Sequence, residues 1–432
     1  MRAALLAVAL LALVQGPRLA PGPGAPLIYS GRADDSWNRL FALLFTRDVR
    51  VRYTSEFPDR GPFHDDPRVF DMFVSGTHPE VSSRVFDRHE DGDRAVDALY
   101  PTFLNLTGPS DALVNPLRGE LVKALNAALD DRTPRTPLAR ALMQADLWSA
   151  YDPLARIQYG RADGAIRASA YELCDLIGKL IGRIALTRAE IASLPDNYAD
   201  ARPTAALPDL FRPGGEWMEV MWAPFHMHDQ EADYRRVARV LMRPVSVPRN
   251  VPGFLAAATR EYPQRSFAQV ALVMQMMLVD STGHVVASPL AQDVQLRTFT
   301  RAADGTLRST SVSEFELSRR KLLANPSSGG FLRFDDGSEA YVAVSGNDYG
   351  FATPMLGMPR ATQPTISTLH VRCNACHGPD GAHLMSFAVQ DPERLPPPRA
   401  LPQPNDERRA AVAREKEARD DFKRLVALTG LR

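Results

Sequence analysis

Cysteine is scarce in this chain, which has 3 cysteines among 432 residues. That number is too small for a scaffold held by several disulfides, which is how many small secreted domains make up for a small core. An excess of charge of one sign is also missing, because 51 basic and 51 acidic side chains leave a formal net charge of zero. The charge balance therefore predicts no nucleic acid and no anionic membrane as a partner.

Long apolar runs are missing as well. The run from Ala3 to Val14 follows a basic start and precedes a tail rich in Gly, Pro and Ala, which is the pattern of a secretory signal peptide. A run of about 12 residues is too short to span a bilayer, which needs about 20. We expect residues 1–25 to be a signal peptide and the mature chain to have no transmembrane segment. The alternative is a buried N-terminal helix in a cytoplasmic protein.

The remaining composition is that of an ordinary globular protein with extra proline. Hydrophobic residues make up 45% and charged residues 24% of the chain, near the averages for globular domains. The 35 prolines exceed the usual share of about 5% and predict many loops. The length allows two or three domains, each with a core of its own.

Two of the three cysteines lie in one short motif. Residues 373–377 read Cys-Asn-Ala-Cys-His, the C-x-x-C-H pattern to which c-type haem is attached. A chance match in this composition is expected on the order of 0.0004 times, so chance is a poor explanation. Each thiol would add to one vinyl group of the haem, and the histidine would ligate the iron. We expect one covalent haem c on Cys373 and Cys376, with His377 as the proximal ligand.

Other chemistries also use a C-x-x-C pair. A redox dithiol is typical of a thioredoxin-like βαβ unit, and no such pattern precedes Cys373. A structural zinc needs four ligands, but Cys174 lies far upstream, and His370 and His377 would be unusual partners. A plain disulfide across two residues would be labile and redox-active. The export signal favours haem, and a haem-free exported protein with a redox or zinc-bound C-x-x-C remains an alternative.

The motif continues with Gly378 and Gly381 as C-x-x-C-H-G-x-x-G. It resembles the haem-binding start of many bacterial c-type cytochromes. The resemblance covers only about Leu369 to Gly381 and leaves the family of the remaining chain unassigned. It implies covalent haem and electron transfer with a redox partner protein, in the periplasm or otherwise outside the bacterial cytoplasm.

The source of a sixth iron ligand differs from that in a small cytochrome c. There a methionine well downstream of the motif supplies it, but here no methionine or histidine follows Met385. We therefore expect the ligand upstream, where Met355 and Met358 lie in a loop framed by prolines; the alternative for both is packing in a core. The other candidates are three histidines: His226, His228 and His370.

The occupant of the sixth coordination position of the haem iron decides between two functions. A methionine ligand raises the potential and favours simple electron transfer, whereas a vacant site permits oxygen or peroxide chemistry. Electron transfer is the favoured interpretation. The first alternative is a peroxidase-like haem enzyme or a haem ligand sensor, with the region before the motif forming a distal pocket.

Helical periodicity dominates the first half. Helix-start signals occur at Ser36, at Asn115-Pro116 and at Thr136-Pro137, the last opening a helix that runs to about Trp148. The strongest apolar stripe predicts a helix from Ala165 to Leu186. Cys174 borders this stripe, and we interpret it as a small buried hydrophobe. A polar stretch from Arg52 to Arg94 predicts turns.

The middle of the chain changes to a β pattern. The apolar run Phe267–Val279 ends in a Gly-containing turn before Val285, which predicts a hairpin, although the length of the run leaves a helix possible. Asp304-Gly305 marks a second turn. Residues 331–334 and 341–344 flank an Asp-Asp-Gly sequence and predict a third hairpin.

Together these patterns predict an α+β protein with a helical N-terminal half, a β-hairpin-rich middle, a C-terminal haem-attachment segment and a final helix. The charges of that helix are expected on a solvated face. After the signal peptide we expect four regions: a mainly helical one at 26–200, a mixed, β-rich one at 201–350, the haem c attachment segment at 351–394, and a Pro-rich linker with the C-terminal helix at 395–432.

Overall fold

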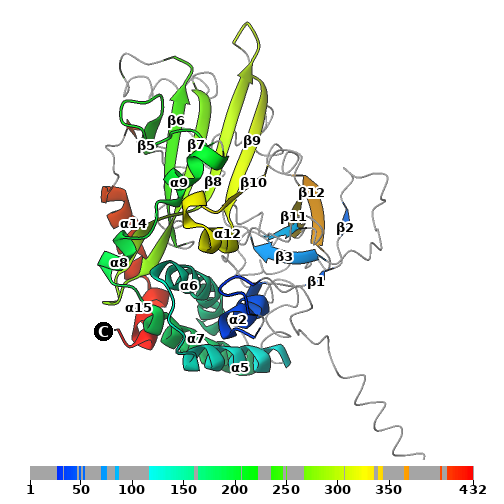
Figure 1. Ribbon diagram of the computed structural model, residues 1–432, viewed down its shortest axis with the longest axis vertical. Helices are drawn as coiled ribbons and strands as arrows, with labels where there is room; N and C mark the ends of the chain where they lie inside the picture. The colour runs from blue at the N-terminus through cyan, green and yellow to red at the C-terminus, as the bar shows by residue number, and fades with distance from the viewer. Residues whose placement is uncertain are drawn as a thin grey trace, which may run out of the picture.

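A layer of helices lies at one end of a seven-stranded antiparallel sheet, with two three-stranded sheets beside them (Figure 1). This arrangement confirms the predicted α+β class. The computed structural model describes residues 27–45 except 33, 48–49, 52–53, 70–74, 83–86, 116–159, 164–205, 207–221, 235–246, 250, 267–305, 307–334, 339–343, 364–368, 399–400 and 406–431. None of the helices in these ranges is long and apolar enough to cross a membrane.

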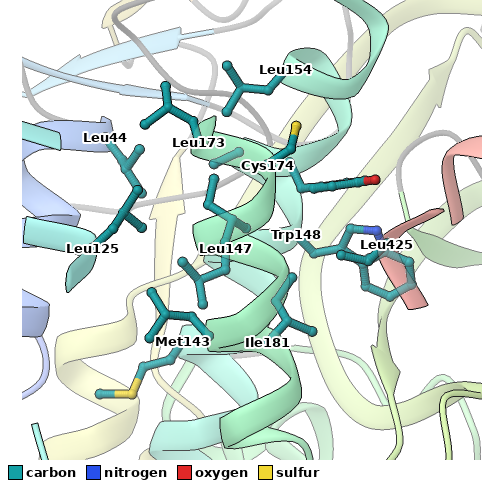
Figure 2. Close-up of a cluster of buried hydrophobic side chains, with 14 of the residues drawn as sticks. Leu44, Leu125, Met143, Leu147, Trp148, Leu154, Leu173, Cys174, Ile181 and Leu425 are labelled. Carbon is teal, nitrogen blue, oxygen red and sulfur yellow. The ribbon is translucent and has the colours of Figure 1, made fainter. Parts of the chain in front are cut away.

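The helical layer forms around the predicted apolar stripe, which is buried along α7 (Gly164–Ile184). Figure 2 shows Leu173 and Ile181 of this helix among side chains from its neighbours, including Leu44 and Leu125. Helices α2, α5, α6 and α15 supply the rest of this core. Their bounds are Ser36–Phe45, Pro116–Asp130, Pro137–Tyr159 and Asp420–Thr429.

The helix starts follow the predicted signals with one correction. Thr136 caps α6 as expected, because its hydroxyl accepts a hydrogen bond from the Ala139 N–H at 3.2 Å. For α2 the cap is Asp35, whose carboxylate accepts from two N–H groups of the first turn; Ser36 instead donates to Asp131. The sequence favoured Ser36 because both residue types cap helices. Helix α6 also runs past Trp148 to Tyr159.

Two of the predicted hairpins form the centre of the large sheet. Strands β7 (Phe267–Val279) and β8 (Val285–Arg301) pair through Val279 and Val285, and β8 pairs with β9 (Leu307–Leu317) across the second predicted turn. The order is β10-β9-β8-β7-β6-β5-β13. The other strands are β5 (Met218–Met221), β6 (Arg236–Pro244), β10 (Phe331–Phe334) and β13 (Arg399–Ala400).

The third predicted hairpin is wrong. Strand β10 pairs with β9, whereas β11 (Glu339–Ala343) pairs with β12 (Pro364–Thr368) in a separate sheet. The Asp-Asp-Gly sequence marks where one strand ends and the next begins, but a turn pattern does not determine which strand each one pairs with.

The turn-rich interpretation of Arg52–Arg94 is wrong where the structure describes this stretch. It contains β2 (Arg52–Tyr53), β3 (Phe70–Val74) and β4 (Ser83–Phe86). Strand β2 pairs in parallel with β12, and β3 lies between β4 and β1 (Asp48–Val49). These strands have only two to five residues and polar neighbours in the sequence, so they give little periodic signal.

Short helices cover one face of the large sheet. Tyr198 of α9 (Asn197–Ala205) and Leu322 of α12 (Arg319–Ala324) pack with strand residues such as Val294. Leu142 of α6 and residues of α8 (Arg188–Ala192) join the same cluster. We call this surface the helix-covered face.

The C-terminal region forms two helices rather than one. Helix α14 (Asp406–Ala418) is followed directly by Arg419, which is the N-cap of α15. Arg408 and Lys416 of α14 are buried together with Val412, so the expectation of a solvated charged face is wrong for this side of the helix.

Candidate functional site

All five predicted site residues lie outside the described residues. They are the attachment residues and the two loop methionines: Cys373, Cys376, His377, Met355 and Met358. The three candidate histidines also lie outside: His226, His228 and His370. The structure does describe the strands that precede and follow the motif. Strand β12 ends at Thr368, five positions before the first motif cysteine, and β13 begins at Arg399, 22 positions after the motif histidine.

The methionine loop and the motif extend from opposite ends of one strand pair. Ala343 pairs with Pro364, so the chain carrying the two methionines connects β11 and β12 at this end. Glu339 pairs with Thr368, so the motif follows the other end. Five paired residues at about 3.3 Å each separate the ends by about 13 Å. The nine positions from Met355 to Pro364 can span about 30 Å, so their reach permits either methionine to approach the motif.

After the motif, the chain returns to the edge of the large sheet. Ala400 of β13 pairs with Val220 of β5. Six positions later α14 begins, and the Arg408 guanidinium donates from Nε to the Ala238 carbonyl of β6 at 3.0 Å. The chain that follows the motif is thus tied to two adjacent strands.

The face of the sheet opposite the helix-covered face carries a third apolar cluster. Its apolar cluster consists entirely of strand residues among those described, with no contribution from a described helix. Three methionines belong to it, so we call it the methionine face. Its buried members are Val220, Ala238, Val240, Met242, Phe267, Val270, Leu272 and Phe299, and Met218 and Met274 are partly buried.

Strand β8 gives the methionine face a polar margin. Asp293, Gln295 and Arg297 pair with Met274, Leu272 and Val270, and paired residues point to the same side of a sheet. The register therefore places all three polar side chains beside the apolar cluster. They are 0%, 1% and 3% exposed, so this margin is enclosed.

One polar group of this margin has no partner. Arg297 Nη2 donates to Gln295 Oε1 at 3.2 Å, but Gln295 Nε2 has no hydrogen-bond partner among the described residues. A buried amide left without a partner costs free energy. The margin therefore places an amide donor, a guanidinium and the Asp293 carboxylate beside one apolar cluster.

A second buried polar group joins the C-terminal helices to the helical layer. Lys416 Nζ lies 3.4 Å from a carboxylate oxygen of Asp152 on α6 and 3.0 Å from Asp421 on α15. Asp152 also pairs with Arg235, which precedes β6. The ammonium lies 5.7 Å from the ring centroid of Trp148. Two acids and two bases balance their charges, and we interpret the group as structural.

The pKa of Asp421 reflects this pairing. Burial would raise the pKa of this carboxyl, but the nearby Lys416 ammonium and the Phe422 N–H lower it below its usual value. Asp421 is therefore ionised at neutral pH, as the ion pair requires.

A third buried group links the N-terminal segment to the end of β9. The Tyr29 hydroxyl donates to Asp146 of α6, and Arg319 of α12 lies 2.7 Å from the same carboxylate. Burial and the Asp146 charge raise the pKa of Tyr29 well above its usual value. The phenol therefore stays protonated and serves as a hydrogen-bond donor.

Cys174 is a free thiol buried in the helical layer, as predicted (Figure 2). Burial raises its pKa, and the Asp152 carboxylate adds to the shift. A thiol that stays protonated is a poor metal ligand and a poor nucleophile. No group of three His, Cys, Asp or Glu suited to a metal ion occurs among the described residues.

The sequence patterns did not reveal the buried charges of the C-terminal helices. Arg408, Val412 and Lys416 recur at intervals of four on one face of α14, which is the spacing of an apolar stripe. That spacing was a usable signal, but long charged side chains on such a stripe usually extend to solvent.

Comparison with known proteins adds no relative. No family model, no curated protein and no solved structure matches this chain.

Proposed function

We propose that this protein is an exported mono-haem c-type cytochrome that transfers electrons in the periplasm. The observation that carries the proposal is the C-x-x-C-H-G-x-x-G sequence at residues 373–381. Cys373 and Cys376 would form the two thioether bonds, and His377 would be the proximal ligand. When bound, the haem supplies a one-electron couple whose potential depends on its axial ligands and on its burial.

Two further features support the proposal. The N-terminal signal pattern agrees with the attachment of c-type haem outside the bacterial cytoplasm, and it makes the periplasm the proposed location. The two strands that flank the attachment segment belong to paired sheets, so both ends of the segment are held by main-chain hydrogen bonds. A redox partner protein follows from the proposed electron transfer.

Covalent haem is tested by expressing the full chain with cytochrome c maturation machinery in the periplasm. We expect sharp reduced absorption bands and a haem-stained band that survives denaturing electrophoresis. Cys373→Ala and Cys376→Ala should each lose one of the two thioether bonds, and the double variant should lose covalent haem. The matched control is Cys174→Ala, which removes the remaining cysteine and should keep full haem. A colourless wild-type product from a competent host would reject the proposal.

The sixth site separates electron transfer from haem catalysis or ligand sensing. These alternatives are retained because no methionine or histidine follows Met385. We expect the reduced spectrum to be unchanged by carbon monoxide if a protein side chain holds the sixth position. A shifted spectrum would favour the peroxidase-like enzyme or sensor. Met355→Leu and Met358→Leu should each be compared with wild type, and only a true ligand should change the spectrum.

A further inference from the structure

A tyrosine of the N-terminal segment is hydrogen-bonded to a buried carboxylate. The Tyr29 hydroxyl donates to Oδ2 of Asp146 on α6, and Arg319 of α12 donates from Nε to the other oxygen, Oδ1, at 2.8 Å. Asp146 and Arg319 are 4% and 0% exposed, so the guanidinium fixes the carboxylate with one oxygen turned to the phenol. This geometry provides a base at hydrogen-bond distance from a phenolic proton.

Apolar side chains surround the contact between Tyr29 and Asp146. A pocket beside these two residues is lined by side chains of α2 and α6: Trp37, Leu40, Phe41, Leu44, Met143 and Leu147. An apolar space offers a water molecule too few polar partners to hold it there. The carboxylate, rather than solvent, is therefore the group placed to take the phenolic proton.

Another buried tyrosine shows the difference that the carboxylate makes. Tyr198 is 2% exposed, and its hydroxyl donates to the Pro208 carbonyl at 2.7 Å. A peptide carbonyl is a much weaker base than a carboxylate. Loss of one electron turns a phenol into a strong acid, so a tyrosine is oxidised more easily when an adjacent base takes its proton. Tyr29 has such a base in Asp146, whereas the hydroxyl of Tyr198 contacts a carbonyl.

We propose that Tyr29 is a one-electron redox site, where the phenol gives an electron to a high-potential metal complex while its proton passes to Asp146. The electron lowers the charge of the metal complex by one. The phenolic O–H bond breaks and an O–H bond forms on Oδ2, which leaves a neutral tyrosyl radical and a neutral carboxylic acid. A one-electron reductant and return of the proton restore the starting state. The site goes beyond the proposed function, because a ferric c-type haem is too weak an oxidant for a phenol.

The aromatic neighbours of Tyr29 suit this chemistry. The ring centroids of Trp37 and Phe41 lie 6.4 and 6.2 Å from that of Tyr29, and both rings meet it edge-on. An indole is oxidised at a potential near that of a phenol, whereas a phenyl ring is not, so Trp37 is the neighbour through which an electron could reach the site. The enclosed hydroxyl should also protect the radical from coupling with a second one. The radical on Tyr29 should therefore outlive radicals on exposed tyrosines.

The test oxidises the full-length protein, with any haem in its ferric state, by photogenerated tris(bipyridine)ruthenium(III). Electron paramagnetic resonance after freeze-quenching records the long-lived radical, and ring-deuterated tyrosine should narrow its signal if the radical is a tyrosyl. We expect Tyr29→Phe to lower this long-lived signal at least tenfold. The matched control is Tyr198→Phe, which removes a buried phenol bonded to a carbonyl and should leave the signal unchanged.

Asp146→Asn separates a redox site from a plain hydrogen bond. Its amide oxygen still accepts a hydrogen bond from the phenol but does not take the proton, so the long-lived signal should fall as it does in Tyr29→Phe. No long-lived signal in the wild type, or a full signal in Tyr29→Phe or in folded Asp146→Asn, rejects the inference. If Asp146→Asn does not fold because Arg319 loses its buried partner, the comparison of Tyr29→Phe with Tyr198→Phe still decides. None of these outcomes depends on covalent haem, so the proposed function is tested separately.

Discussion

Buried charged side chains in this protein occur with partners on other elements. Lys416 contacts carboxylates of α6 and α15, and Arg319 contacts Asp146. Arg239 of β6 pairs with Glu219 of β5 through two hydrogen bonds. Such pairs add little net stability relative to apolar residues, but removal of one partner leaves an uncompensated charge.

Lys416 offers the clearest test of the cost of removing one partner from a buried ion pair. Its side chain is fully buried, so Lys416→Met leaves Asp152 and Asp421 without the ammonium and should lower the free energy of unfolding by about 3–5 kcal/mol. Urea denaturation measures the loss. The matched control is Lys423→Met, which removes an exposed pair with Asp420 and should cost at most about 1 kcal/mol. Equal losses in the two variants would show that the buried group is not structural.

Asp131 should make stability depend on pH. Burial would raise the pKa of its carboxyl, but hydrogen bonds from Thr133, Arg135 and Ser36 lower it well below the usual value. A lowered folded-state pKa stabilises the protein above the unfolded value of about 3.9, and this contribution disappears as the pH falls through the folded value.

Asp131→Asn should therefore be less stable than wild type by about 1–2 kcal/mol at pH 7. The difference should shrink as the pH is lowered from about 5 toward 2, because the carboxyl of the unfolded chain takes up a proton in this range while the folded one stays charged. Chemical denaturation at several pH values provides the measurement. Asp34→Asn is the control, because Asp34 pairs with Arg32 at an exposed site. A difference that stayed constant with pH would contradict the assignment.

At the scale of elements, the sequence predicted those with strong periodicity or clear start signals. The α7 stripe and the Pro137 start of α6 are examples, because a long apolar face and a capped first turn are both local. Strand partners were predictable across two short turns, as for β7 and β8, but not for β10, which pairs with β9 rather than with β11. Pairing depends on residues far apart in the chain, and no local pattern contains that information.

Gly329 shows how two elements depend on one residue without a side chain. It follows the short helix at Pro326–Ser328, has a φ of 70°, and packs against Asn197 and Ala201 of α9. A Cβ there would overlap the Asn197 carbonyl oxygen.

Gly329→Ala should therefore lower the free energy of unfolding by about 3 kcal/mol or more, from backbone strain and overlap together. Gly305 separates the two causes. Its φ is 83°, but no atom lies within 4 Å of the position that a Cβ would take, so Gly305→Ala should cost only about 1–2 kcal/mol. Thermal or urea unfolding of both variants provides the comparison. Similar losses would mean that α9 moves away at little cost.

At the scale of the whole molecule, composition and period predicted the α+β class, whereas the haem chemistry indicated by one five-residue motif stays a prediction. The arrangement that connects them was not predictable. The methionine face combines residues of four strands between Met218 and Phe299, and the chain that follows the motif returns to the large sheet as β13, paired with β5. Two-residue strands such as β13 carry no periodic signal, so the sequence could not show where the chain returns.

We expect the proposed haem to add to a fold that two larger cores already support. The apolar clusters of the helical layer and of the helix-covered face contain most of the buried side chains. A Cys373→Ser/Cys376→Ser double variant should therefore keep its far-UV circular dichroism while losing covalent haem.

If the proposed haem packs against the protein, the same double variant should be less stable than the holoprotein, because it loses that apolar contact. We expect a loss of a few kcal/mol, about what two or three side chains contribute at roughly 1.5–3 kcal/mol each, and stronger binding of a hydrophobic dye. Thermal unfolding of the double variant beside Cys174→Ala measures this. Complete unfolding would show that the two larger cores cannot form without haem. An unchanged midpoint would show that the attached haem does not pack against the folded protein.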